Sequence, residues 1–159
     1  LNRGGVRMGT AEFYRVVESL PEVADSLVVD TSSAAGEGDL LLFVVLAPDA
    51  DESAVAAALK KSIRTELSPR HVPGVIVPVA SVPRTLNGKK CEVPVKRILG
   101  GMAVDAAVSR DALADPAAFD EFMRAAIRSA TGGVAGSANG SPIGSVAGSV
   151  TAPAGSSRP

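Results

Sequence analysis

Two stretches of the chain carry apolar residues at helical spacing. The first stripe is formed by Phe13, Val16, Val17 and Leu20. These positions lie at i, i+3, i+4 and i+7 and share one face of an amphipathic helix, which Thr10 can cap and Pro21 ends. The second stripe is formed by Val55, Leu59, Ile63 and Leu67. The same reasoning predicts a second helix, begun by Asp51 or Ser53 and ended by Ser68-Pro69.

Between and after these helices the pattern changes to short apolar runs that predict strands over residues 26–30, 40–47 and 74–80. The run 40–47 is apolar throughout, so both faces of that strand are expected to be covered. Pro78 interrupts the last run, which favours an edge position. The order of elements predicts an α/β (α+β) fold in which helices flank a mixed three-stranded sheet.

The last part of the chain divides into helical and low-complexity segments. A short helix is predicted over residues 95–99, closed by Gly100 and Gly101, and another after Asp115, which can cap it. Of the 29 residues 131–159, 16 are Gly, Ser or Pro. Such a segment has too little bulk to offset its ordering entropy and is predicted to be a disordered tail. We therefore expect a domain at 1–101, a helical extension at 102–130 and a tail at 131–159.

Charge is distributed unevenly along the chain. Residues 60–97 hold nine basic and two acidic side chains, although the net charge of all 159 residues is −1. This segregation indicates either an anionic partner or a solvated basic face. Nucleic acid is disfavoured as the partner because aromatic residues, which would stack on bases, make up only 3% of the chain.

Redox, metal and membrane signals are sparse. A single cysteine, Cys91, excludes an internal disulfide framework and a cysteine-based zinc site, and a single histidine, His71, excludes a histidine cluster, so no metal site is predicted. We expect His71 to be a surface or capping residue and Cys91 a small buried one. The longest apolar run has 8 residues, and the N-terminus has no signal pattern, so we expect a cytoplasmic protein without membrane helices. The chain lacks an initiator Met, and we expect it to be part of a longer protein.

One loop carries candidate chemistry. Residues 83–89 read Pro-Arg-Thr-Leu-Asn-Gly-Lys, and Asn87-Gly88 predicts a tight turn because both residue types tolerate positive φ. The loop would project Lys89, a movable point charge suited to neutralising a carboxylate or phosphate. It does not match a phosphate-binding P-loop, because Pro83 and Lys90 stand where Gly and Ser or Thr are needed. From spacing alone, a solvated turn lysine is the simpler interpretation.

A resemblance changes this balance. Residues 83–89 resemble the P-x-T-x-S/N-G-K loop of the adenylate-forming (AMP-forming) acyl-CoA synthetases, and residues 5–12 resemble the Gly-Arg-Glu segment that opens their small C-terminal domain. The resemblance covers about residues 4–101. It implies an acid–thiol ligase that joins a carboxylate to AMP and then transfers the acyl group to CoA. Residues 67–73 and 88–96 resemble the acetoacetyl-CoA synthetases in particular, which implies acetoacetate as the substrate.

The resemblance also implies roles for single residues. Lys89 would be the catalytic lysine of adenylation, Arg7 a contact to the nucleotide, and Gly5 and Gly9 the close approach to the pantetheine arm of CoA. Arg64 would contact the CoA phosphates. ATP, CoA and Mg²⁺ are the implied cofactors, with Mg²⁺ held mainly by an N-terminal domain that this chain lacks and without which it would be inactive.

Two further expectations follow from the resemblance. The small domain would rotate between two poses, one presenting Lys89 and the other the face at residues 5–12. A lysine acetyltransferase acting on Lys89 would be a partner, since acetylation would remove the charge. Three alternatives remain open: an acetyl- or propionyl-CoA synthetase type of ligase domain, a non-catalytic CoA- or protein-binding module, and a small RNA-binding domain.

Overall fold

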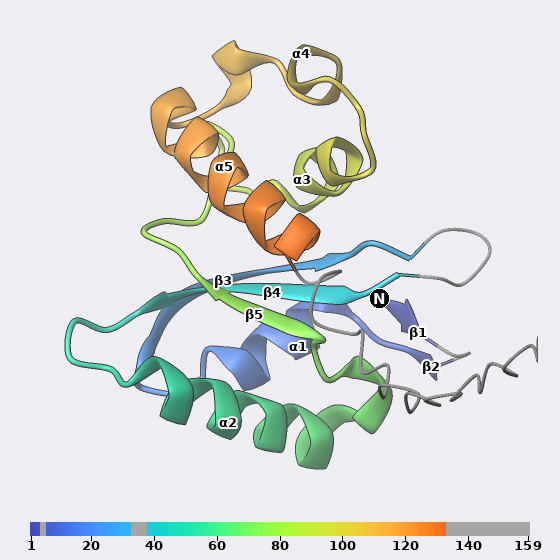
Figure 1. Cartoon of the computed structure of the whole chain (residues 1–159), viewed down its shortest axis with the longest axis vertical. Helices are drawn as coiled ribbons and strands as arrows, with labels where there is room; N and C mark the ends of the chain where they lie inside the picture. The colour runs from blue at the N-terminus through green and yellow to red at the C-terminus, as the bar shows by residue number, and fades with distance from the viewer. Residues whose placement is uncertain (4–5, 33–37, 133–159) are drawn as a thin grey trace, which may run out of the picture.

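The computed structural model describes residues 1–3, 6–32 and 38–132, and only the backbone within residues 2–7. The predicted tail falls outside the described residues apart from Thr131 and Gly132, which end a helix. Figure 1 shows a three-stranded sheet with helices on both of its faces. The predicted α+β fold is therefore confirmed.

The sheet has the order β3-β4-β5, formed by Val23–Asp30, Leu40–Leu46 and Val75–Pro78. β3 and β4 are antiparallel, whereas β4 and β5 are parallel, so the sheet is mixed as predicted. β4 is the central strand, and its first five residues are buried, which explains its unbroken apolar run. Among the described strands, β5 pairs only with β4, and Pro78 stands at its last position. The edge position inferred from this proline is confirmed.

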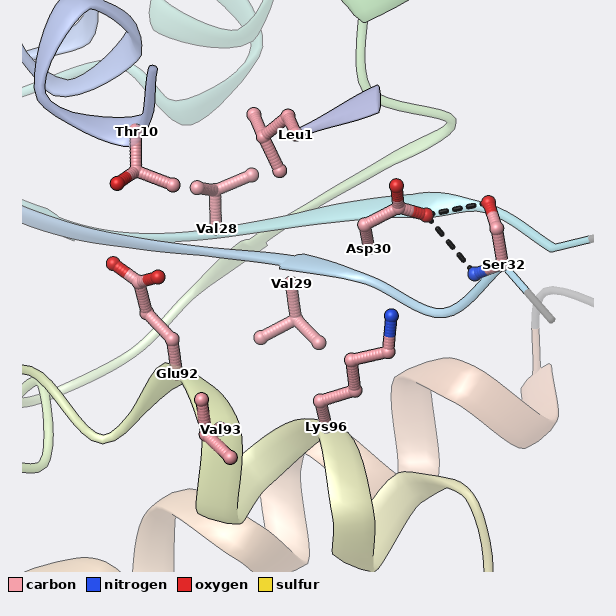
Figure 2. Close-up of a pocket in the computed structure, with 9 residues that line it drawn as sticks. All are labelled: Leu1, Thr10, Val28, Val29, Asp30, Ser32, Glu92, Val93 and Lys96. Carbon is pink, nitrogen blue, oxygen red and sulfur yellow. Dashed lines mark hydrogen bonds between the residues drawn. The ribbon is translucent and has the colours of Figure 1, made fainter. Parts of the chain in front are cut away.

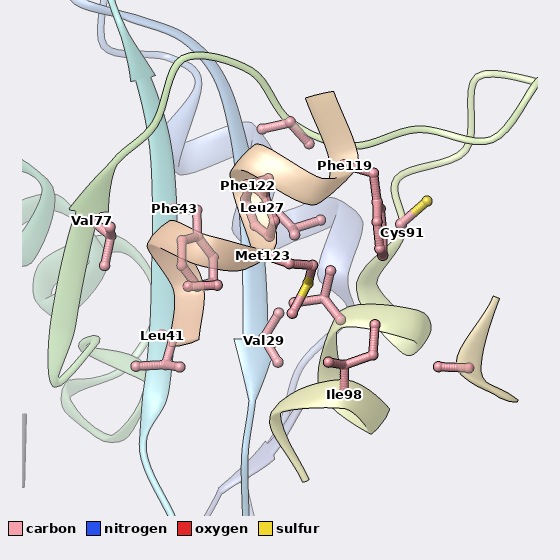
Figure 3. Packing of buried hydrophobic residues seen from close by; sticks show 14 of the residues in the cluster. Leu27, Val29, Leu41, Phe43, Val77, Cys91, Ile98, Phe119, Phe122 and Met123 are labelled. Atoms are coloured by element: carbon pink, nitrogen blue, oxygen red, sulfur yellow. The ribbon is translucent and has the colours of Figure 1, made fainter. Parts of the chain in front are cut away.

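Each face of the sheet covers its own hydrophobic cluster. α1 (Thr10–Val17) and α2 (Glu52–Ser62) pack on one face, against Val28, Leu40, Leu42 and Val44. α3 (Glu92–Leu99) and α5 (Pro116–Gly132) pack on the other, against Leu27, Val29, Leu41, Phe43 and Val77. The alternation along β3 and β4 is the period of two expected of strands that are buried on both faces. Figure 3 shows this second cluster, in which Phe43 lies beside Phe122 of α5, with ring centroids 4.8 Å apart.

The predicted helices are present, but some of them begin or end at other residues than predicted. Asp51 caps α2 through Oδ1, which accepts a hydrogen bond from the N–H of Ala54 at 2.7 Å, and Asp115 caps α5 in the same way at Ala118. The prediction for Thr10 was wrong. Gly9 is the N-cap of α1 and Thr10 is its first helical residue, because Gly9 has the extended backbone that an N-cap needs. α1 also ends at Val17, ahead of Pro21.

Several short elements were not predicted. β1 (Asn2–Arg3) and β2 (Val6–Arg7) form an antiparallel pair, and α2 continues into a π-helical turn, η1 (Ile63–Leu67), and a 3₁₀ turn, η2 (Pro69–His71). α4 (Val104–Ala107) and η3 (Arg110–Ala112) precede α5. His71 is fully buried, so its expected surface position was wrong, whereas Cys91 is buried as expected. Across the described ranges, no helix combines the length and the apolar character needed to cross a membrane.

Candidate functional site

Residues 83–91 form a short hairpin, the Lys89 hairpin, that leads from β5 into α3. The N–H of Cys91 donates to the carbonyl of Pro83 at 3.0 Å, and the N–H of Thr85 donates to the carbonyl of Lys89 at 2.8 Å. The turn is closed by the N–H of Gly88 on the carbonyl of Thr85 at 2.8 Å. Gly88 has φ +76°, while no described non-glycine residue has positive φ, so only the glycine of the predicted Asn-Gly pair uses this freedom.

Lys89 occupies the end of this turn. Its backbone N–H donates to Thr85 Oγ1 at 3.2 Å, which fixes the direction of the main chain, and its side chain is exposed. Within the described part of the chain, its ammonium group has no hydrogen-bond or ion-pair partner. The hairpin thus presents a cation that is free to meet an anion from another molecule or domain.

Lys90 is the next residue, and its side chain is held by four groups of the protein. Its Nζ lies 2.5 Å from Glu18 Oε1, 3.1 Å from Asp25 Oδ1 and 2.7 Å from the carbonyl oxygen of Ser26. The same atom lies 3.8 Å from the centre of the Tyr14 ring, within cation–π distance. Only 15% of the Lys90 side chain is exposed, so these contacts are shielded from water.

Arg84 links the first strand of the hairpin to β3. Its Nη2 donates to both carboxylate oxygens of Asp25, at 2.9 and 2.8 Å, and its Nη1 donates to the carbonyl of Gly88 at 2.9 Å. Burial alone would raise the pKa of Asp25, but hydrogen bonds from Arg84 and Lys90 hold the pKa below its ordinary value. One guanidinium therefore connects β3 to the residue that immediately precedes Lys89.

Tyr14 completes this set of contacts. Its hydroxyl donates to Glu92 Oε1 at 2.7 Å and accepts from the N–H of Val28 at 3.1 Å, and burial raises the pKa of this hydroxyl. Tyr14 and Lys90 thus cover backbone groups on the open edge of β3, which would otherwise be unpaired. We call these side chains the base network: Tyr14, Glu18, Asp25, Arg84, Lys90 and Glu92.

Two adjoining grooves lie beside the hairpin. Lys89 lines a groove of about 440 Å³, whose other walls include Thr10 and Ala11 of α1 and Val93 of α3. A second groove of about 360 Å³ shares Thr10, Glu92 and Val93 with the first. Figure 2 shows the second groove, with Thr10 on α1 and Glu92 and Lys96 on α3, on either side of β3. The surface around Lys89 therefore joins the first turn of α1 to that of α3.

The structure brings together only part of the predicted site. Gly9 directly precedes Thr10 and so stands next to the groove that Lys89 lines. Arg64 lies exposed on η1 and does not line either groove. Arg7 belongs to β2, where only its backbone is described, and Gly5 is outside the described residues.

Sequence reasoning missed the base network and overestimated the free basic charge. Arg84 and Lys90 are paired within the protein. The exposed Lys60, Lys61 and Arg64 lie on α2 and η1, whereas Lys96 and Arg97 lie on α3, on the opposite face of the sheet. The positive stretch therefore does not form one surface for an anion. In the described ranges, no group of three or more His, Cys, Asp or Glu side chains is placed to hold a metal ion.

Comparison of the chain with known proteins identifies its family. Residues 15–89 match the family described as the AMP-binding enzyme C-terminal domain, and the match ends at Lys89. The chain therefore belongs to the family of AMP-binding enzyme C-terminal domains.

Within the family, the chain is similar to acetoacetyl-CoA synthetases. It is 43% identical to that of Caenorhabditis elegans over 126 residues and 42% identical to that of Rhizobium meliloti (strain 1021) over 125 residues. These matches cover 78% and 77% of the chain but 18% of each relative. The solved structure of acetoacetyl-CoA synthetase from Streptomyces lividans has 41% identity and a TM-score of 0.69, over 78% of this chain and 19% of that one. The chain thus spans about a fifth of the length of these relatives.

Proposed function

We propose that this chain supplies the C-terminal domain of an AMP-forming acid–thiol ligase that converts acetoacetate, ATP and CoA into acetoacetyl-CoA, AMP and pyrophosphate. The observation that carries the proposal is the Lys89 hairpin, which holds its backbone rigidly and leaves the ammonium group of Lys89 exposed. The names of the similar relatives support acetoacetate as the carboxylate. We assign residues 1–101 to this domain.

In the first step, a carboxylate oxygen of the substrate attacks the α-phosphorus of ATP and pyrophosphate leaves with the electrons of the broken P–O bond. Lys89 would lie between the carboxylate and the α-phosphate. Its positive charge would bring two anions together and stabilise the negative charge that develops in the transition state. An exposed lysine on a short, rigid turn suits this role because the cation can enter an active site formed by another domain.

In the second step, the CoA thiol would attack the acyl-adenylate carbonyl and release AMP. We propose that Gly5, Gly9 and Arg7 face the nucleotide and the pantetheine arm at this stage, and that Arg64 contacts the CoA phosphates. Arg64 and Lys89 lie in different parts of the domain, which agrees with a rotation between two poses. Mg²⁺ would enter with ATP and be held mainly by the N-terminal domain. Acetylation of Lys89 in the cytoplasm would remove its charge and stop the first step.

The test compares Lys89→Ala with Lys60→Ala, a control at an exposed lysine of α2, in the full-length protein that contains this chain. Acetoacetate-dependent exchange of pyrophosphate into ATP reports the first step, and thioester formation from preformed acetoacetyl-AMP reports the second. Loss of one preorganised cation is expected to slow exchange about 10²–10³-fold. Thioester formation should be unchanged in both variants. Survival of both activities in Lys89→Ala would refute the proposal and favour a non-catalytic binding module.

A further inference from the structure

The C-terminal extension contacts the Lys89 hairpin through backbone hydrogen bonds. Thr85 and Leu113 form an antiparallel bridge. The N–H of Leu86 donates to the carbonyl of Ala112 at 2.9 Å, and the N–H of Ala114 donates to the carbonyl of Arg84 at 2.9 Å. Residues 112–114 therefore lie along the outer edge of the hairpin like a short third strand.

This third strand is itself held in place. Leu113 is 3% exposed and packs in the cluster between the sheet, α3 and α5. Immediately after it, Asp115 caps α5 by accepting from the N–H of Ala118 at 2.9 Å. On the preceding side, the N–H of Leu113 closes η3 on the carbonyl of Arg110. The segment is thus fixed to the core and cannot shift without disturbing the start of α5.

We propose that residues 112–114 are a positioning element for adenylation: they hold the Lys89 hairpin in the orientation that the first half-reaction requires. The inference rests on the proposed role of Lys89. An isolated two-stranded hairpin is marginally stable in water, and a third strand supplies the missing support. Because a displacement of about 1 Å in a reacting group can cost about 10²-fold in rate, such support bears directly on the chemistry. The match to the shared family domain ends at Lys89, so this support comes from outside it.

Leu86→Pro removes one of the two hydrogen bonds while the turn is preserved. Leu86 is the second residue of the turn that Gly88 closes on Thr85, a position where proline is favoured. Thr85 is in an antiparallel bridge, so the extended backbone that proline imposes on its predecessor is already present. Proline lacks only the N–H that donates to Ala112. The matched control is Leu86→Ala, which loses the same exposed side chain but keeps the donor.

Ala114→Pro removes the other bond from the side of the extension. Leu113 has φ −85° and ψ 138°, a conformation that is compatible with a following proline. The exposed side chain of Ala114 makes little contact, and Ala114→Gly keeps the N–H that donates to Arg84. The two proline variants therefore each remove one hydrogen bond of the same strand pairing, one from each strand, and each variant has its own control.

The variants are compared in the full-length protein by the two half-reaction assays. Each proline variant should lower kcat for pyrophosphate exchange about tenfold relative to its control, with unchanged KM for ATP and unchanged thioester formation. The double variant should lose less than the product of the two single effects, because both bonds support one unit. A structural defect would instead reduce both half-reactions.

The outcomes separate the two proposals. Equal exchange rates in the proline variants and their controls, or equal losses in the two half-reactions, would overturn the inference and leave the role of Lys89 standing. Full exchange activity in Lys89→Ala would overturn both. If one proline variant does not fold, the other pair decides the question alone.

Discussion

The tip and the base of the Lys89 hairpin use adjacent lysines in opposite ways. At the tip, the Lys89 side chain is exposed, and none of the described residues pairs with it. At the base, Lys90 contacts two carboxylates, a carbonyl and an aromatic ring. One residue of separation on a two-stranded turn is enough to place the two side chains in these different surroundings. The two adjacent lysines therefore differ in that the charge of Lys90 is paired within the protein, whereas that of Lys89 is exposed.

The contacts at the base matter for the tip because they preorganise the backbone that carries Lys89. A flexible lysine on a flexible loop would lose conformational entropy whenever it entered an active site. Here the backbone entropy is already lost, because Arg84 ties Gly88 to Asp25 and Lys90 ties the second strand to β3. In the proposed reaction, only the side chain of Lys89 would remain to be ordered.

The largest effect is expected when the two lysines are exchanged separately for methionine. Lys89→Met should slow adenylation about 10²–10³-fold and change the free energy of unfolding by less than about 0.5 kcal/mol. Lys90→Met should lower the free energy of unfolding by about 1–3 kcal/mol, because it leaves partly buried carboxylates unpaired. Pyrophosphate exchange measures the first effect and urea denaturation of the chain measures the second.

Lys61→Met serves as the control for both measurements, since Lys61 is exposed on α2 and should affect neither. A loss of stability in Lys89→Met as large as that in Lys90→Met would show that tip and base are not distinct. Normal stability in Lys90→Met would show that its contacts contribute nothing.

The next effect concerns Arg84, which joins Gly88 at the tip of the hairpin to Asp25 at its base. Arg84→Lys keeps the charge but replaces a planar group that makes three hydrogen bonds with a point charge that cannot match that geometry. Adenylation should slow about tenfold through misplacement of Lys89, with thioester formation unchanged. Arg97→Lys, at an exposed position of α3, is the matched control. If both half-reactions of Arg84→Lys retain wild-type rates, the hydrogen bonds of Arg84 have no part in positioning Lys89.

A smaller effect is expected from Gly88→Ala. No atom lies within 4 Å of the position that its Cβ would occupy, so the substitution meets only the backbone strain of φ +76°. That strain costs about 1 kcal/mol and should lower the unfolding free energy by that amount. Adenylation should slow by a few fold as the turn adjusts. Gly100→Ala is the control for stability, because Gly100 has an ordinary φ of −80° and an added Cβ would meet no atom closer than 3.4 Å.

The tip of the hairpin could be predicted from sequence because its signals are local. Asn87-Gly88 marks the turn, and the motif around Lys89 is contiguous in the chain. The same is true of the stripes that form α1 and α2 and of Pro78 at the edge strand. Each of these features depends on residues within a few positions of one another.

The base of the hairpin could not be predicted in this way. Asp25 and Arg84 are 59 positions apart, and Glu18 and Lys90 are 72 apart, so no periodicity joins them. A charge count placed Arg84 and Lys90 in a basic stretch that would meet either an anionic partner or solvent, because such a count cannot detect internal pairing. The contact of residues 112–114 with the hairpin consists of backbone hydrogen bonds, which leave no signal in side-chain composition.

The smallest effect is a change in the pH dependence of stability at the base. The pKa of Asp25 lies below its ordinary value of 3.8 in the folded protein, so the unfolded chain takes up a proton first as the pH falls. Stability from this group is complete above pH 3.8 and is lost as the pH falls through the lower folded pKa. Its slope stays below about 1.4 kcal/mol per pH unit, the limit for one proton. Asp25→Asn should flatten this part of the profile in acid urea titrations. An unchanged slope in Asp25→Asn would mean that Arg84 and Lys90 do not stabilise the ionised carboxylate, which would remove the electrostatic part of the difference between base and tip.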